Sequence, residues 1–149
     1  MADHVRKQIR DAAAAALTGL ATTGARVYES KTHELQDANL PGLRIYTNSE
    51  TLEILELLHS ANRTIHRVLD LLVECCSKKA SGMDDELDAM IKEVEVALAA
   101  NQGIGGAKWV QLQRIEIDME GEAEKEVGVA RMTFAVHYTT ALATPDIAQ

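Results

Sequence analysis

The stretch KWVQLQRIEIDMEGEAEKEVGVARMTFAVHYT, residues 108–139, decides the fold. Its two arms, 108–119 and 127–139, alternate apolar and polar residues, as strands with one buried face do. The segment between them, 120–126, is polar and contains a glycine, which is the composition of a turn. The stretch therefore predicts a long antiparallel β-hairpin, whose arms could extend roughly 40 Å.

The predicted hairpin is long for a domain of 149 residues. A lone domain rarely needs so long a hairpin, because exposed strand edges invite pairing with other chains. A ring-forming subunit does need one, since its neighbours can continue or clasp the sheet. An ordinary hairpin packed on its own helices remains the alternative at this point.

Each arm of the hairpin has one apolar side. These sides consist of Ile115, Ile117 and Met119 on the first arm and Met132, Phe134, Val136 and Tyr138 on the second.

Two helices are predicted outside the hairpin. Residues 4–20 repeat apolar side chains at spacings of three and four, with Asp3 as the expected N-cap. Residues 83–100 repeat them in the same way and carry acidic residues in the first turn. Ser81 followed by Asp84 resembles a capping box for this second helix.

The remaining segments predict shorter elements. Residues 25–29 have the β-branched and aromatic content of a strand, and residues 43–47 alternate apolar and polar side chains as a strand does. A loop is expected at 48–50. The last residues, 141–149, carry a proline and no apolar pattern, and a loose tail is predicted there.

Residues 51–76 allow two interpretations. Between 63 and 76 the apolar residues fall on one parity, broken only by Arg67, which favours a long strand. Residues 52–59 would then form a shorter strand paired to it. A single long helix spanning both segments is the competing interpretation.

These elements together predict an α+β fold. Its sheet is mostly antiparallel, with a long C-terminal β-hairpin, and its two main helices pack on one face. The length of 149 residues suits one domain, 1–149.

Charge and composition narrow the function classes. The net charge of −8 argues against a stand-alone nucleic-acid binder, which needs a basic face to displace counterions from phosphates. It is compatible with a protein through which DNA merely passes. The sequence has no run of 18 apolar residues, so no transmembrane helix is predicted. The N-terminal segment is too weakly apolar for a secretory signal. The default expectation is a cytoplasmic protein.

No pattern in the chain predicts catalysis, a metal site or a cofactor. The glycine-rich segment 103–106 follows a helix rather than a strand, so we interpret it as a helix stop and a flexible loop. The adjacent Cys75 and Cys76 would point to opposite faces of a strand, which makes joint zinc ligation awkward. Glu116 and Asp118 are interpreted as part of a polar strand face rather than an acid–base pair.

The order of landmarks along residues 5 to 140 resembles the phage tail terminator family, also called tail completion or minor tail protein U-like proteins. No single landmark is specific, and the resemblance lies in their succession. It comprises an N-terminal amphipathic helix running into Thr23-Gly24-Ala25-Arg26-Val27-Tyr28, then Leu40-Pro41-Gly42-Leu43-Arg44-Ile45-Tyr46-Thr47, a strand led by Arg63-Thr64-Ile65, a helix begun by Asp84-Asp85-Glu86-Leu87-Asp88, and Arg131-Met132-Thr133-Phe134-Ala135-Val136-His137-Tyr138. The Cys75-Cys76 pair and residues 52–59 have no counterpart in this pattern.

The resemblance implies a structural virion protein without a catalytic step. Such proteins form a hexameric ring that caps the tail tube, ends its polymerisation and offers a surface for joining the head. The implied partners are other copies of the chain, the tail tube protein and a head completion or connector protein, with DNA passing through the lumen unbound. The implied location is the head-proximal end of the tail in the virion, after assembly in the host cytoplasm. Six copies would carry a charge of roughly −48, consistent with a lumen that repels DNA.

Within such a ring, Gln111, Gln113 and Arg131 of the hairpin are the predicted interface residues. The loops at 30–39 and 101–107 are expected to meet neighbours or partners as well. Two other classes stay open. One is a different virion component, such as a head–tail connector or tail-tube protein. The other is a small α+β enzyme or ligand-binding domain, which would show a deep pocket with convergent polar groups.

Overall fold

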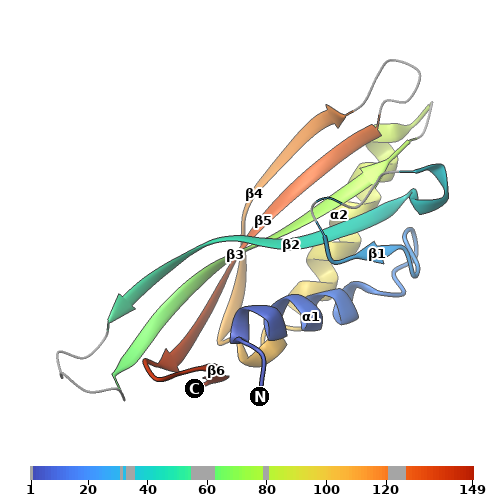
Figure 1. Cartoon of the computed structure of the whole chain (residues 1–149). Helices are drawn as coiled ribbons and strands as arrows, with labels where there is room; N and C mark the ends of the chain where they lie inside the picture. Colours follow the sequence, from blue (N-terminus) through green and yellow to red (C-terminus); the bar gives the residue numbers. More distant parts are fainter. Residues whose placement is uncertain (1, 31, 33–35, 55–62, 79–80, 121–126) are drawn as a thin grey trace.

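The computed structural model describes residues 2–30, 32, 36–54, 63–78, 81–120 and 127–149. Two helices pack on one face of a curled, mostly antiparallel six-stranded sheet (Figure 1), so the predicted α+β class is confirmed. The elements are α1 (Val5–Leu17), β1 (Val27–Tyr28), η1 (Asp37–Asn39), β2 (Gly42–Ile54), β3 (Thr64–Ser77), α2 (Met83–Ala99), η2 (Ile104–Gly106), β4 (Trp109–Glu120), β5 (Val127–Ala141) and β6 (Thr144–Ala148).

The sheet is ordered β1-β2-β3-β5-β4, and β6 pairs with β5. Among the described strands, β1 and β2 pair in parallel and the other pairings are antiparallel. The predicted hairpin is β4 and β5, and the predicted long strand over 63–76 is β3, so the competing long helix is wrong. Of the strand predicted at 52–59, residues 52–54 belong to the end of β2 and pair with β3. The rest of that prediction, and the hairpin tip at 121–126, lie outside the described residues.

The core lies between the helices and one face of the sheet, which we call the inner face. Alternate residues of β3 and β5 point into it, because side chains on a strand alternate between faces. The helices contribute the apolar stripes predicted for them, including Ile9, Leu17, Leu87 and Leu98, all fully buried or nearly so. Neither α1 nor α2 packs on the opposite face of the sheet, which we call the open face (Figure 1).

Arg67, which breaks the apolar parity of β3, lies on the inner face. Its Nε donates to Thr140 Oγ1 at 2.9 Å, and its Nη1 lies 3.6 Å from Glu50 Oε1. Glu50 also accepts a hydrogen bond from the buried Tyr138 hydroxyl. The charged residue is therefore tolerated in the core because an acid from β2 and hydroxyls from β5 meet its donors.

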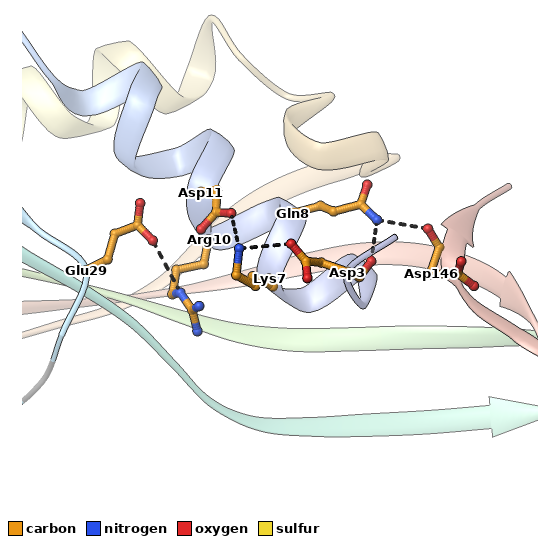
Figure 2. A network of polar contacts seen from close by, with 7 residues as sticks. All are labelled: Asp3, Lys7, Gln8, Arg10, Asp11, Glu29 and Asp146. Atoms are coloured by element: carbon orange, nitrogen blue, oxygen red, sulfur yellow. Dashed lines mark hydrogen bonds and ion pairs between the residues drawn. The ribbon is translucent and has the colours of Figure 1, made fainter. Parts of the chain in front are cut away.

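Both predicted helix caps are wrong. His4 caps α1, since its Nδ1 accepts from the Arg6 backbone N–H at 3.1 Å. Asp3 instead pairs with Lys7 Nζ at 3.0 Å, one turn into the helix (Figure 2). The N-cap of α2 is Gly82, at a φ of 75° and without a side-chain cap, so Ser81 forms no capping box.

Two connections predicted as irregular are ordered parts of the sheet. β2 runs through 48–50, with a register shift between Thr47 and Glu50, because a bulge absorbs the polar residues without ending the strand. The predicted loose tail at 141–149 is also wrong, since β6 pairs with β5. Gln8 Nε2 donates to the Asp146 carbonyl at 2.8 Å and so links α1 to this last strand (Figure 2).

The glycine-rich segment after α2 forms η2 and packs closely on α1, so it is not the flexible loop that we expected. Gly105 has a φ of 59°, and a Cβ built there would lie 2.6 Å from Ile9 Cα. A glycine is needed because both the left-handed backbone and the close approach of α1 exclude a side chain. Gly103, in the same segment, has neither constraint.

We predict that Gly105→Ala lowers the free energy of unfolding by about 2–3 kcal/mol, because a methyl group would push against the α1 backbone at a positive φ. Gly103→Ala is the matched control and should change stability by less than about 0.5 kcal/mol. Urea denaturation of both variants checks this. Equal stability of the two variants would contradict the described packing of η2 on α1.

Candidate assembly surface

The three predicted interface residues do not form a compact cluster. Gln111 is exposed on β4 opposite Ala135, and Gln113 is the exposed bulge residue between Leu112 and Arg114. Arg131 lies on the open face of β5, four residues before Ala135, which corresponds to about 13 Å along the strand. The structure thus places all three on the hairpin but spreads them along it.

Arg131 takes part in an internal ion network. Glu74, on the central strand β3, is 1% exposed and lies directly opposite both Arg44 of β2 and Arg131 of β5. Its Oε1 is 2.9 Å from Arg44 Nη2, and its Oε2 is 2.9 Å from Arg131 Nη2. On β4 the next residue in this row is Glu116, so the charges alternate in sign across four strands.

The network holds Arg131 firmly in its charged state. Burial alone would disfavour the cation, but hydrogen bonds with Tyr46 and Glu74 outweigh it and raise the pKa of Arg131. A buried carboxylate between two guanidiniums is stable only as long as all partners are present, because each charge has given up water. A charge reversal at Arg131 would therefore disturb the fold and could not report cleanly on an interface.

An aromatic and imidazole cluster occupies the other end of the open face. The Trp109 ring stacks on the His137 ring, with centroids 4.4 Å apart. His66 Nε2 lies 3.2 Å from His137 Nδ1, within hydrogen-bond reach. Burial and the neighbouring His66 lower the pKa of His137, so its imidazole is neutral at pH 7. The cluster was not singled out from the sequence, because its members are far apart along the chain.

The first exposed sheet edge is β4. Among the described residues only β5 pairs with it, and its other side is unpaired. Ile115, Ile117 and Met119 point to the inner face but are 40%, 57% and 48% exposed. A groove of about 240 Å³ adjoins their row between α2 and β4. It is lined by Glu95, Leu98, Ala99, Gln102, Val110, Leu112 and Phe134.

The second exposed edge is the far half of β2. β1 pairs with β2 only at Leu43 and Arg44, and no other described strand covers the side of β2 that faces away from β3. Beyond the bulge, Leu52 and Ile54 point to the inner face and are each 51% exposed. The sheet therefore presents apolar side chains along both of its open edges.

The structure describes one of the two predicted contact loops fully and the other only in part. The 101–107 segment contains η2 (Ile104–Gly106), which packs against α1. Of 30–39, residues 31 and 33–35 lie outside the described part of the chain. A hollow of about 540 Å³ lies between α1 and the turn after α2, and small and neutral side chains line it. Convergent charged groups are not found in that lining.

The two cysteines point to opposite faces of β3, as expected for neighbours on a strand. Cys75 joins the inner core, and Cys76 packs with Val127, Val129 and Leu40 on the open face. Burial and the adjacent Cys76 raise the pKa of the Cys75 thiol well above its ordinary value. This thiol is thus not an activated nucleophile. Within the described ranges, no group of three or more histidine, cysteine or acidic residues could hold a metal ion.

Comparisons with known proteins give no family or relative from which a function could be inferred. No family model matches the chain, and no curated protein is similar enough to it to count as a relative. Across the helices that the structure describes, none is long and apolar enough to cross a membrane. What distinguishes the molecule is the pair of apolar sheet edges.

We predict that Glu74→Gln lowers the free energy of unfolding by about 3–5 kcal/mol, because it leaves the buried guanidinium of Arg44 and the partly buried one of Arg131 beside a neutral amide. Glu116→Gln is the matched control. Its partner Arg114, at 2.7 Å, is exposed, so the loss should stay below about 1 kcal/mol. Urea denaturation at neutral pH measures both, and a small effect at Glu74 would show that the network is not needed for stability.

We also predict that the fluorescence of Trp109, the only tryptophan of the chain, titrates with a midpoint below 6.5 as His137 becomes protonated. His66→Gln removes a neighbouring charge and should raise that midpoint. Because the folded pKa is depressed, the contribution of His137 to stability is present above about pH 6.5 and is lost as the pH falls through the folded pKa. A midpoint that ignores the His66 substitution would contradict this coupling.

Proposed function

We propose that this chain is a structural virion protein, a phage tail terminator. In this proposal six copies form a ring on the end of the tail tube, stop its polymerisation and provide the surface that joins the head. No chemical step is involved, and the work is done by differential binding to the tube end on one side and to a head completion protein on the other. The proposed location is the head-proximal end of the tail, after assembly in the host cytoplasm.

The observation that carries the proposal is the pair of exposed edges of one sheet. Monomeric proteins protect such edges, since an unpaired strand with apolar side chains is a template for association. Here both edges keep apolar residues about half exposed, Ile115 and Ile117 on β4 and Leu52 and Ile54 on β2. A subunit with two different edges can join head to tail, and such contacts close into a ring when the rotation between copies permits.

Charge supports the passage of DNA without binding. The open face of the sheet, which would line the lumen, has more acids than bases among its described residues. An acidic lumen repels phosphates and lets DNA slide through. The residues that point to this face are Glu53, Asp70, Glu74, Glu116 and Asp118 against Arg44, Arg114 and Arg131.

The same edges favour one second candidate, a tail-tube or connector protein. A tube protein also continues its sheet from copy to copy but stacks into open-ended polymers. The two functions differ in whether assembly stops. The hollow beside α1 gives weaker support to a ligand-binding domain, because no charged side chain lines it.

We expect native mass measured over a concentration series to show a species near six times 16.2 kDa, and negative-stain images of it to show closed rings. Open-ended stacks would instead favour the tube protein. If the chain is monomeric alone, the decisive assay adds it to purified tail tubes. A terminator blocks their further elongation by tube protein, and unimpeded elongation would rule the terminator function out.

A further inference from the structure

The two exposed edges have the strand directions needed to join one copy to the next. β2 and β5 run in one direction and β3 and β4 in the other, because each neighbouring pair on this path is antiparallel. If the sheet of one copy continues past β4 into β2 of the next copy, the two edge strands meet antiparallel. The pairing is heterologous, since two different surfaces meet, as a closed ring requires.

We infer that adjacent copies are joined by this sheet continuation, with residues 114–117 of β4 pairing with residues 50–53 of β2 in the next copy. The inference rests on the proposed ring and names the surfaces that build it. The occupant of the β4 edge is thus a second copy of this chain.

Charge and face together select the register. On β4, Arg114 points to the open face and Ile115 to the inner face. On β2, Glu53 points to the open face and Leu52 to the inner face. Antiparallel pairing of Glu53 with Arg114 sets Leu52 opposite Ile115, so an acid meets a base and two apolar side chains meet each other. A shift of two residues toward Met119 would set Glu53 against Glu116 instead, and a shift of one would mismatch the faces.

The same register covers Leu52, Ile54 and Ile115, whereas Ile117 would lie opposite Glu50 and Met119 would lie outside the pairing. Leu52 would cover Ile115 on the inner face, and Ile54 would lie beside the groove between α2 and β4, near Leu112. Each of these edges alone leaves its apolar row in water. Paired, the two rows continue the layer between helices and sheet from one copy into the next.

The register also gives a geometry that a ring can close. Within one copy Thr51 is level with Trp109, through Val68 and His137. In the proposed pairing Thr51 faces Glu116 of the neighbouring copy. Glu116 is level with Arg131, which lies six residues from His137 along β5. The offset is about 20 Å per copy at about 3.3 Å per residue.

This offset corresponds to a strand tilt that is common in closed sheets. Each copy contributes four strands, β2, β3, β5 and β4, which lie about 4.8 Å apart, so one copy is about as wide as the offset is long. Strands with this ratio of offset to width are inclined by about 45° to the ring axis. Six copies then form a barrel about 50 Å across, measured at the backbone. An opening of that size is wide enough for a DNA duplex, in keeping with the proposed lumen.

Disulfide cross-linking tests the pairing with and without purified tail tubes. Directly paired residues have Cβ atoms about 4.5–5.5 Å apart, and a small shift brings them within disulfide reach. The native Cys75 and Cys76 are both fully buried and leave engineered surface thiols as the reactive ones. The variants are Leu52→Cys, Ile115→Cys and the chain that carries both.

We expect mild oxidation of the double variant to give a ladder of covalent species that ends at six chains. A mixture of the two single variants should give dimers only, and each single variant alone should stay monomeric on a denaturing gel. The control combines Leu52→Cys with Val96→Cys, whose site is exposed on α2 but outside the edge, and should not cross-link.

Failure of the inference and failure of the proposed function give different results. Rings of six chains in which the 52 and 115 sites do not cross-link would overturn the inference and leave the terminator function standing. Dimers of Ile115→Cys alone would show that β4 pairs with itself and would also overturn it. A ladder that continues past six, with open-ended polymers in the microscope, would support the edge pairing and overturn the terminator function.

Discussion

The fold depends on the pairing of β3 with β5. Fourteen consecutive residue pairs join these strands without a bulge, from Thr64 opposite Ala141 to Ser77 opposite Gly128. Because side chains alternate along both strands, this one register decides for the whole sheet which residues reach the helices and which reach the open face. It places Leu71 against Phe134 in the core and Glu74 beside Arg131 on the opposite face. The helices, the ion network and the edge strands all take their positions from it.

Much of this architecture was predictable because the patterns are strong where one face is buried. The parity of β3, the hairpin arms and the stripe of α2 each follow from the burial of alternate or helically spaced residues. The errors lie where a polar residue has a tertiary partner. The polar segment 48–50 looks like a loop but is a bulge in β2, and the tail without an apolar pattern is held as β6 by hydrogen bonds from Gln8 and β5. The helix caps were missed because a histidine and a glycine replace the usual side chains.

The candidate surface was harder to predict than the fold. Arg131 looks exposed in an alternating strand, and only the register across three strands reveals that it neutralises Glu74. Ile115 and Ile117 have the same parity as buried core residues, so the sequence alone cannot distinguish them from the core. They are exposed because α2 packs mainly over β3 and β5 and less over the edge strand β4. Alternation of apolar and polar residues predicts the faces of a sheet, whereas the edge strands can be identified only once the strand order is known.

The two neighbouring cysteines show how the layers of the molecule can be followed separately. Both thiols are fully buried although they leave β3 on opposite sides, so this end of the strand is covered on both faces. A thiol reagent reaches Cys75 only after the helices lift from the sheet, and it reaches Cys76 only after the contacts with Leu40 and Val129 open. The order in which the two thiols become modified therefore reports which covering layer is lost first when the protein opens.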